Sequence, residues 1–321
     1  MSSVRDLIDQ AATAGRLISE GTFTVELSKA KDKLQLYRLE DPSRYILSLL
    51  ASANSSGARH FWVREREHGI LVSHDGEAIG AEELEELFEK IALGAAASKT
   101  SLTELGMAIQ GARALHPERV IFESGDRESG VIIILDGRTA RIQMLRDLPQ
   151  REGVHVSATN RFYLHTKKPS LFNRMLGRQE KQAEGEALRR YGRFSPCKIH
   201  WNGVPLPTPT LGGWNFSERL DGETRLLQLE LIGSERLRTD NPGSFSAYLG
   251  FGSSPGVWLI VNDGVRFQIK VPESAPPTSR AIVFTTGLRK DLSGQQLVED
   301  SLYQSLLSAL EIRFHQLEER F

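Results

Sequence analysis

The chain has 321 residues, which is long for one domain and comfortable for two, each able to bury its own core. Its 40 basic and 41 acidic residues leave a net charge of −1, so no global field attracts nucleic acid or an anionic membrane surface. The single cysteine, Cys197, excludes an intramolecular disulfide and a cysteine-cluster metal site. Without a long apolar segment near the start, we expect neither a signal peptide nor a membrane span, and a cytoplasmic location.

The first part of the sequence is rich in helical patterns. Asp41-Pro42 is typical of a helix start, because aspartate accepts backbone N–H bonds and proline fits the first turn. That helix should reach about Ser52. Before it, the periodicity predicts three elements: a helix over 4–20, a strand over 22–27 and a polar helix over 29–37.

Two strands are predicted next, over 60–64 and 69–74, followed by an amphipathic helix over 81–93. The stretch between the last two, residues 73–80, contains a glycine turn. A turn between a strand and a helix is a common place for a ligand pocket, so these residues are the first candidates for a site.

Ser101 and Glu104 have the spacing of a capping box and predict a helix to about Leu115. An antiparallel meander should follow, with strands over 119–123, 131–135, 139–144 and 154–157. Helices followed by a meander predict an α+β sandwich, with a mixed, mostly antiparallel sheet covered by helices on one face. A doubly wound fold does not fit this pattern.

The second half is predicted to be a smaller α+β domain. We expect a first domain over 1–165, a connecting helix within 166–195 and an accessory domain over 196–321. A charged helix over 171–191 leads into short strands separated by turn residues, and a helix with a continuous apolar stripe closes the chain. The strands are expected over 197–200, 226–232, 257–261, 265–269 and 281–285.

Three segments of the first half share order and spacing with a known group of proteins. They are Ser-Leu-Leu-Ala-Ser-Ala-Asn-Ser-Ser-Gly-Ala at 48–58, the turn at 73–79 with Glu-Glu-Leu at 82–84, and Ser-Lys at 98–99 with Leu-Gly-Met-Ala-Ile-Gln-Gly at 105–111. In this the chain resembles the GHKL superfamily of ATP-binding domains, the Bergerat fold. The superfamily includes type II topoisomerases, ninety-kilodalton heat-shock chaperones, sensor histidine kinases and mismatch-repair ATPases. The likeness covers about 22–157, and the second half is similar to the accessory domain of the chaperone and mismatch-repair members.

The resemblance implies that the catalytic positions have changed. Ser48 stands where the family has a glutamate that activates water, and Ser52 stands one helical turn later, where an asparagine holds magnesium. A serine hydroxyl is no general base at neutral pH without a base of its own. The resemblance therefore implies that hydrolysis by the family mechanism is lost.

The adenine side of the implied pocket has also changed. His74 falls at the position of the family's adenine-reading aspartate, and Gly76 is retained beside it. A neutral imidazole can accept one hydrogen bond but brings no negative charge. Asp75, one residue away, should point to the other side of the extended chain.

On the phosphate side the resemblance implies contacts from Ser98 and Lys99, and from the glycines at 106 and 111. The middle glycine of the family's loop is replaced by Ile109, whose branched side chain restricts how closely a phosphate approaches the backbone. Simple structural roles remain open for the retained residues: Gly76 as a turn residue, Lys99 as a solvated side chain, Gly106 as a close-packing position.

Two further kinds of site are not predicted. His60, His68 and His74 have no spacing typical of a metal-ligand set. The basic residues over 174–198 are interrupted by glutamates and carry no interleaved aromatic residues, so we interpret them as a solvated helix face and do not expect a nucleic-acid partner.

The leading hypothesis is a degenerate GHKL-type protein that acts as a binding, scaffold or chaperone-like regulatory module with little or no ATP hydrolysis. Its partners would be proteins, including a second copy through the terminal helix. No cofactor is predicted with certainty, and ATP and magnesium are the candidates. The alternative is an active chaperone-like ATPase that binds ATP and magnesium in an altered pocket, through His74, Lys99, Gly106 and Gly111, with a base such as Glu77. A third possibility is an α+β binding protein unrelated to this superfamily.

Overall fold

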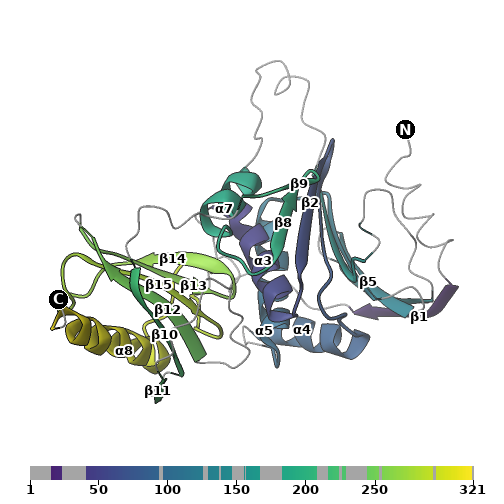
Figure 1. The fold of residues 1–321 in the computed structure, drawn as a ribbon. Helices are drawn as coiled ribbons and strands as arrows, with labels where there is room; N and C mark the ends of the chain where they lie inside the picture. Colours follow the sequence, from purple (N-terminus) through teal and green to yellow (C-terminus); the bar gives the residue numbers. More distant parts are fainter. Residues whose placement is uncertain are drawn as a thin grey trace. The chain divides into compact units, whose positions relative to one another are not determined.

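The larger of the two sheets has nine strands (Figure 1). The structure is a computed structural model, and it describes residues 16–23, 41–93, 97–125, 129–136, 139–146, 155, 157–166, 183–207, 216–223, 226–228, 244–252, 255–291 and 294–319. The strand order is β1-β6-β5-β4-β7-β3-β2-β8-β9. All neighbours run antiparallel except β2 and β8, which are parallel, so the sheet is mixed and mostly antiparallel as predicted. The strands are β1 (Arg16–Phe23), β2 (His60–Arg66), β3 (Gly69–His74), β4 (Arg119–Gly125), β5 (Ser129–Asp136), β6 (Thr139–Arg146), β7 (Asn160–His165), β8 (Lys198–Trp201) and β9 (Val204–Pro205).

Three helices, α3 (Tyr45–Ser55), α4 (Ala81–Leu93) and α5 (Thr100–Ala114), lie along one face of this sheet (Figure 1). A short 3₁₀ turn, Pro42–Arg44, precedes α3 and begins where Asp41-Pro42 predicted a helix start. The ring of Tyr45 on α3 lies 6.0 Å from that of Phe162 on β7, so this face is the one that also carries the buried Phe61 of β2. Alternate residues of β2, such as Trp62, point to the other face.

The second sheet has six strands in the order β11-β10-β12-β15-β13-β14, and the closing helix α8 (Ser301–Glu318) packs on it. Asp300 caps α8 by accepting from the backbone N–H groups of Leu302 and Tyr303. The predicted apolar stripe is confirmed, because Leu306 and Phe314 are fully buried in the core of this sheet. The strands are β10 (Phe216–Glu223), β11 (Leu226–Gln228), β12 (Ser244–Phe251), β13 (Val257–Asn262), β14 (Val265–Ile269) and β15 (Ser279–Thr285).

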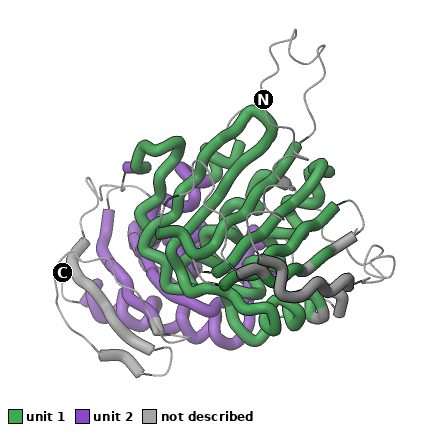
Figure 2. The backbone as a smooth tube through the Cα atoms, turned by 90° about the vertical axis from the view of Figure 1, so that its right-hand side faces the viewer, with its two compact units in different colours: residues 1–187, 197–206 green, residues 188–196, 207–321 purple. Residues whose placement is uncertain are grey.

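The chain forms two compact units that are interleaved along the sequence (Figure 2). The first unit contains residues 1–187 and 197–206, and the second contains 188–196 and 207–321. Residues 197–206 therefore belong with the first sheet and not with the accessory domain to which 196–321 was assigned. Local pattern could not show this, because β8 reaches the sheet through a parallel pairing with β2, which is more than a hundred residues earlier.

The start of the chain differs from the prediction. Residues 16–20, expected within a helix over 4–20, belong to the strand β1, which pairs with β6. Residues 1–15 and 24–40 lie outside the described part, and with them the polar helix over 29–37 and most of the strand over 22–27. The apolar residues of this segment have a weak helical periodicity, but pairing with β6 makes it a strand. A local sequence pattern does not show such long-range pairing.

A second difference concerns the strand predicted over 154–157. His155 and Ser157 lie outside any strand, and the chain enters the sheet as β7 only at Asn160. Five consecutive residues of β7 are buried, from Asn160 to Leu164, since this strand is central in the sheet and covered on both faces. Alternation is absent in such a strand, which explains why it was missed.

The capping box predicted at Ser101 and Glu104 is not formed. Helix α5 begins one residue earlier, at Thr100, with Lys99 as the N-cap residue, and both members of the expected box are buried inside the helix. Helix α7 (Ala183–Tyr191) is the described part of the predicted connecting helix, and residues 167–182 lie outside the described residues. Among the described helices, none is long and apolar enough to span a membrane.

Candidate functional site

The glycine turn after β3 is held by a buried polar network on strands β4 and β7. Asn160 of β7 is fully buried, and its Nδ2 donates to the carbonyl oxygens of Glu77 at 2.9 Å and Gly76 at 3.3 Å. Its Oδ1 accepts from the hydroxyl of Ser124 on β4 at 2.7 Å, and that hydroxyl accepts from the backbone N–H of Ile79 at 2.6 Å. Two central strands therefore determine the shape of the turn.

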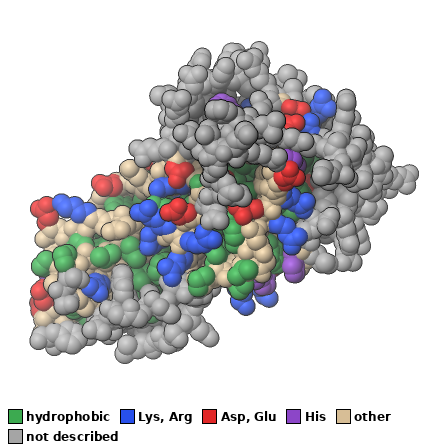
Figure 3. Space-filling view, turned by 90° about the horizontal axis from the view of Figure 1, so that it is seen from above, with side chains coloured by type: hydrophobic (Ala, Val, Ile, Leu, Met, Phe, Trp, Pro, Cys, Tyr) green, Lys and Arg blue, Asp and Glu red, His purple; other side chains and the backbone are tan. Residues whose placement is uncertain are grey.

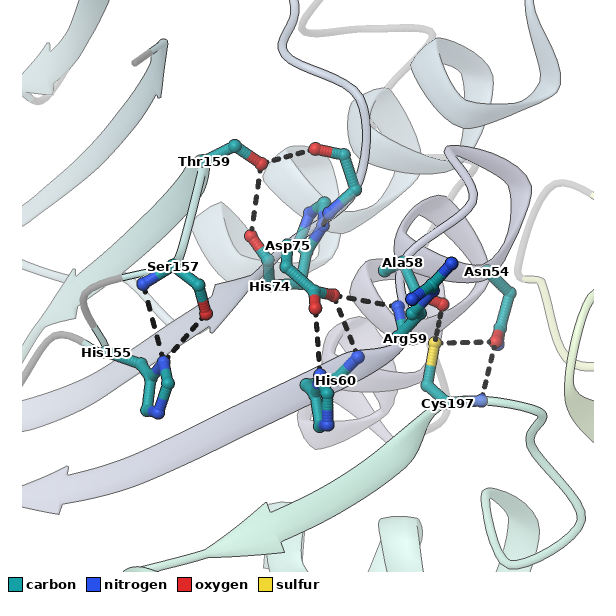
Figure 4. Close-up of polar contacts among 11 residues, drawn as sticks. Asn54, Ala58, Arg59, His60, His74, Asp75, His155, Ser157, Thr159 and Cys197 are labelled. Carbon is teal, nitrogen blue, oxygen red and sulfur yellow. Dashed lines mark hydrogen bonds and ion pairs between the residues drawn. The ribbon is translucent and has the colours of Figure 1, made fainter. Parts of the chain in front are cut away.

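Thr159, just before β7, makes a second set of bonds to the same turn (Figure 4). Its backbone N–H donates to the carbonyl of His74 at 3.0 Å, and its hydroxyl contacts the carbonyl oxygens of His74 and Gly76. The carbonyl oxygens of His74, Gly76 and Glu77 are thereby bonded within the protein.

His74, the residue at the implied adenine-reading position, is buried and has an internal partner. Its Nδ1 accepts from the backbone N–H of Gly76 at 3.3 Å. Burial lowers its pKa from 6.5 to about 4, outweighing the opposite effect of the negative charge of Asp75, so the ring is neutral at pH 7. An adenine amino group would meet a neutral ring whose Nδ1 is already engaged.

Asp75 points to the other side of the chain, as predicted (Figure 4). Its Oδ1 accepts from the backbone N–H groups of Arg59 at 2.7 Å and His60 at 2.8 Å, and its Oδ2 lies 2.8 Å from Nδ1 of His60. Partial burial raises the pKa of Asp75, but the hydrogen bonds from His60 and Arg59 outweigh it and hold the pKa below its ordinary value. Asp75 thus fastens the turn to the start of β2.

Gly76 is required by packing. A Cβ atom at this position would lie 2.1 Å from the hydroxyl oxygen of Ser56, at the end of α3, and 3.0 Å from Nδ1 of His74. The glycine therefore allows the turn to lie against the helix that carries the two implied catalytic positions.

Those positions, Ser48 and Ser52, lie one turn apart on α3. Ser52 is buried, and its hydroxyl donates to the backbone carbonyl of Ser101 on α5 at 2.8 Å. Ser48 is half-buried. The side chain at the implied magnesium position thus ties two helices together, and a hydroxyl engaged in this way is a poor ligand for a hard cation.

The implied phosphate contacts at Ser98 and Lys99 are paired with carboxylates. The backbone N–H and the hydroxyl of Ser98 both donate to Glu86 of α4, each at 2.7 Å. The Nζ of Lys99 lies 2.8 Å from Glu83 and 3.7 Å from Glu77 of the glycine turn. Such exposed pairs contribute little stability, but they compensate the charge that would attract a phosphate.

Gly106 and Gly111 are buried within α5, well beyond its first turn. Backbone N–H groups at these positions donate inside the helix and are not available to an anion. Ile109, between them, is 2% exposed. Because both glycines lie inside a helix, they form no loop around a phosphate.

The structure brings some of the predicted residues together. His74 and Gly76 share one turn, and Lys99 reaches the same turn through Glu77, whereas Gly106 and Gly111 lie inside α5. Sequence reasoning missed the residues that hold the turn: Ser56, Ser124, Thr159 and Asn160.

Among the residues that the structure describes, no three His, Cys, Asp or Glu side chains are grouped so that they could hold a metal ion. Two of the histidines considered as metal ligands have carboxylate partners instead. His60 is bonded to Asp75, and Nε2 of His68 lies 3.6 Å from the carboxylate of Glu67.

No family model and no curated protein sequence matches this chain. The fold is similar to that of two solved structures. The crystal structure of the B-subunit of the DNA gyrase from Myxococcus xanthus matches with a TM-score of 0.46 and 10% identity, over 91% of this chain and 95% of that one. The ATPase region of Saccharomyces cerevisiae topoisomerase II matches with a TM-score of 0.46 and 9% identity, over 84% and 85% of the two chains.

At 9–10% identity, these matches compare the fold and say nothing of which residues form a site. What the site of this chain holds follows from its own side chains.

Replacing Asn160 by alanine should loosen the turn without disturbing the helices. The change leaves the carbonyl of Glu77 and the Ser124 hydroxyl without their buried partner, while the carbonyl of Gly76 keeps only the Thr159 hydroxyl. This should reduce the free energy of unfolding by about 2 kcal/mol. Hydrogen exchange should then quicken at the amides of Gly76, Glu77 and Ile79. Amides of α8 serve as an internal control, and unchanged exchange in the turn would show that Asn160 does not hold it.

Proposed function

We propose that this chain is a degenerate GHKL-type protein that acts by binding, as a scaffold or chaperone-like regulator, with little or no ATP hydrolysis. One observation carries the proposal: the polar groups at the implied nucleotide positions are satisfied by the protein itself. Nδ1 of His74, the hydroxyl of Ser52 and the ammonium group of Lys99 each have an internal partner. A nucleotide would have to break these contacts before making its own.

The chemistry of hydrolysis is also unsupported at these positions. Activation of water needs a general base whose pKa lies near the working pH, and a serine hydroxyl at position 48 does not supply one. Magnesium prefers carboxylate and free oxygen ligands, whereas the Ser52 hydroxyl already donates to a backbone carbonyl. Binding of a protein partner, without hydrolysis of ATP, is therefore the function that these residues support best.

The partners we propose are proteins, including a second copy of this chain, in the cytoplasm. A reducing compartment agrees with the state of Cys197, a buried free thiol whose Sγ lies 2.9 Å from Oδ1 of Asn54 and 3.1 Å from the carbonyl oxygen of Ala58 (Figure 4).

The test is to measure phosphate release and thermal stability with millimolar ATP and magnesium. We expect phosphate release no faster than in the protein-free blank and a melting temperature that ATP does not change. If ATP did bind, a concentration of a hundred times its Kd would stabilise the protein by about 2.7 kcal/mol, which the melting temperature would show. Hydrolysis at a rate usual for the superfamily would refute the proposal.

The same assay separates the alternative, an ATPase with an altered pocket. In that case ATP would stabilise the wild-type protein, and the stabilisation would disappear in the Lys99→Ala and His74→Ala variants. Lys270→Ala, an exposed cation in the second unit, is the matched control and should leave any ATP effect unchanged.

A further inference from the structure

The parallel pairing of β2 with β8 gathers rings and positive charges that the sequence keeps apart. On β2 the alternation places His60, Trp62 and Arg64 on the face opposite the helices, since Phe61 and Val63 between them are buried. The register sets Lys198 of β8 beside His60 and His200 beside Trp62. Side chains of paired residues lie on the same face, so both join this group.

The rings of this group are nearly parallel. The Trp62 ring lies 4.2 Å from that of His155 with an angle of 8° between their planes, and 5.3 Å from that of His60 with an angle of 12°. The His200 ring lies 6.3 Å from Trp62 and 6.1 Å from His60. Trp62, His60, His155, His200, Arg64 and Lys198 are called the ring patch from here on.

The ring patch is accessible. His155, Arg64 and Lys198 are exposed, and the other three side chains are half-buried. Because His155 is exposed while stacked on Trp62, a planar group can extend the stack on its outer side. Histidine side chains are seen beside Lys and Arg side chains on the surface of the described residues (Figure 3).

The charge of the ring patch is positive. Arg64 and Lys198 are exposed cations of the patch. The adjacent carboxylate, Asp75, is engaged by the His60 ring and two backbone N–H groups. The pKa of His200 is lowered, mainly by burial and to a smaller extent by the positive charges of His60, His155 and Lys198.

The histidines are better suited to stacking than to metal binding. Nδ1 of His60 is bound to Asp75, and Nδ1 of His155 lies 2.8 Å from the hydroxyl of Ser157 (Figure 4). The described side chains form no three-ligand group, as stated above. What the patch offers is flat ring surface bordered by cations.

We propose that the ring patch binds single-stranded nucleic acid. Unpaired bases stack on aromatic rings, every base has a flat face, and the backbone phosphates pair with arginine and lysine. Arg64 and Lys198 are the phosphate contacts, and the exposed ring of His155, stacked on Trp62, is the stacking contact. A duplex hides the faces of its bases, so the patch favours single strands.

This partner class goes beyond the proposed function and does not depend on the nucleotide site. The sequence argued against nucleic acid because the basic residues over 174–198 lack interleaved aromatic residues. In the folded protein the interleaving arises between strands, from His-Phe-Trp-Val-Arg of β2 and Lys-Ile-His of β8.

The experiment measures fluorescence anisotropy of labelled oligothymidylate and oligouridylate of about 20 nucleotides, without ATP or magnesium, over a series of salt concentrations. A duplex of equal length and polyglutamate are the comparison ligands. We expect single strands to bind more tightly than either. Trp62→Ala should weaken binding about tenfold or more, and Trp62→Phe should restore most of it. Lys198→Glu should also reduce the salt slope by about one, because one phosphate contact is lost.

Lys270→Glu is the control, since Lys270 is an exposed cation of the second unit. Circular dichroism establishes that each variant is folded. An absence of binding at low salt, an affinity unchanged by Trp62→Ala, or an equal loss with Lys270→Glu would each overturn the proposal. Polyglutamate bound as tightly as the single strands would do the same. Because ATP is absent, the result is independent of whether the nucleotide site works.

Discussion

Between about pH 7.5 and pH 4.5 the wild-type protein should lose about 2.5 kcal/mol more of its free energy of unfolding than the His74→Asn variant. The pKa of His74 is lowered to about 4 by burial, from 6.5. The unfolded chain therefore binds a proton more readily than the folded one, and stability present above pH 6.5 is lost as the pH falls towards 4. Urea titrations at a series of pH values measure the difference.

Asparagine is the suitable replacement because its amide oxygen can accept from the N–H of Gly76, as Nδ1 of His74 does, and has no proton to gain. Other titrating groups, including His200, act in both proteins and cancel in the comparison. Parallel stability curves for the two proteins would mean that His74 is not held neutral by the fold.

Replacing Gly69 by alanine should reduce the free energy of unfolding by about 4 kcal/mol, a loss typical of a severe clash at a special backbone conformation. Gly69 opens β3 with φ near +140°, a conformation that residues with a side chain rarely adopt. An added Cβ would lie 1.7 Å from the carbonyl oxygen of Leu164 on β7. The carbonyl belongs to a strand in the middle of the sheet, so it has little freedom to move away.

Gly203→Ala is the matched control for this prediction. Gly203 also has a positive φ, of 84°, but a Cβ atom there meets nothing within 4 Å. Its replacement should cost about 1 kcal/mol through the backbone alone. The difference between the two melting temperatures then measures the clash. Equal losses in the two variants would show that the sheet relaxes around position 69.

The elements predicted correctly are those whose signal is local. Helix α4 and strands β3 and β14 have the predicted bounds, because periodicity and adjacent turn residues define them within a few residues. Asn202 and Gly203 form the predicted turn, with φ values of 52° and 84°. The sandwich with helices on one face followed from the order of such elements.

The elements that were missed depend on contacts far along the chain. β1 exists because it pairs with β6, and β7 lacks alternation because both its faces are covered. The same limit applies to the site. His74 and Gly76 could be placed in a turn from the sequence, but their partners Thr159 and Asn160 are more than eighty residues away. No spacing rule connects residues at that separation.

The chain passes between its two units three times, at residues 187–188, 196–197 and 206–207. No single cleavage can therefore separate them intact. A cut after residue 206 leaves 188–196 behind, and a cut before residue 188 removes strands β8 and β9 from their sheet. A protease or a recombination event with one junction damages at least one unit.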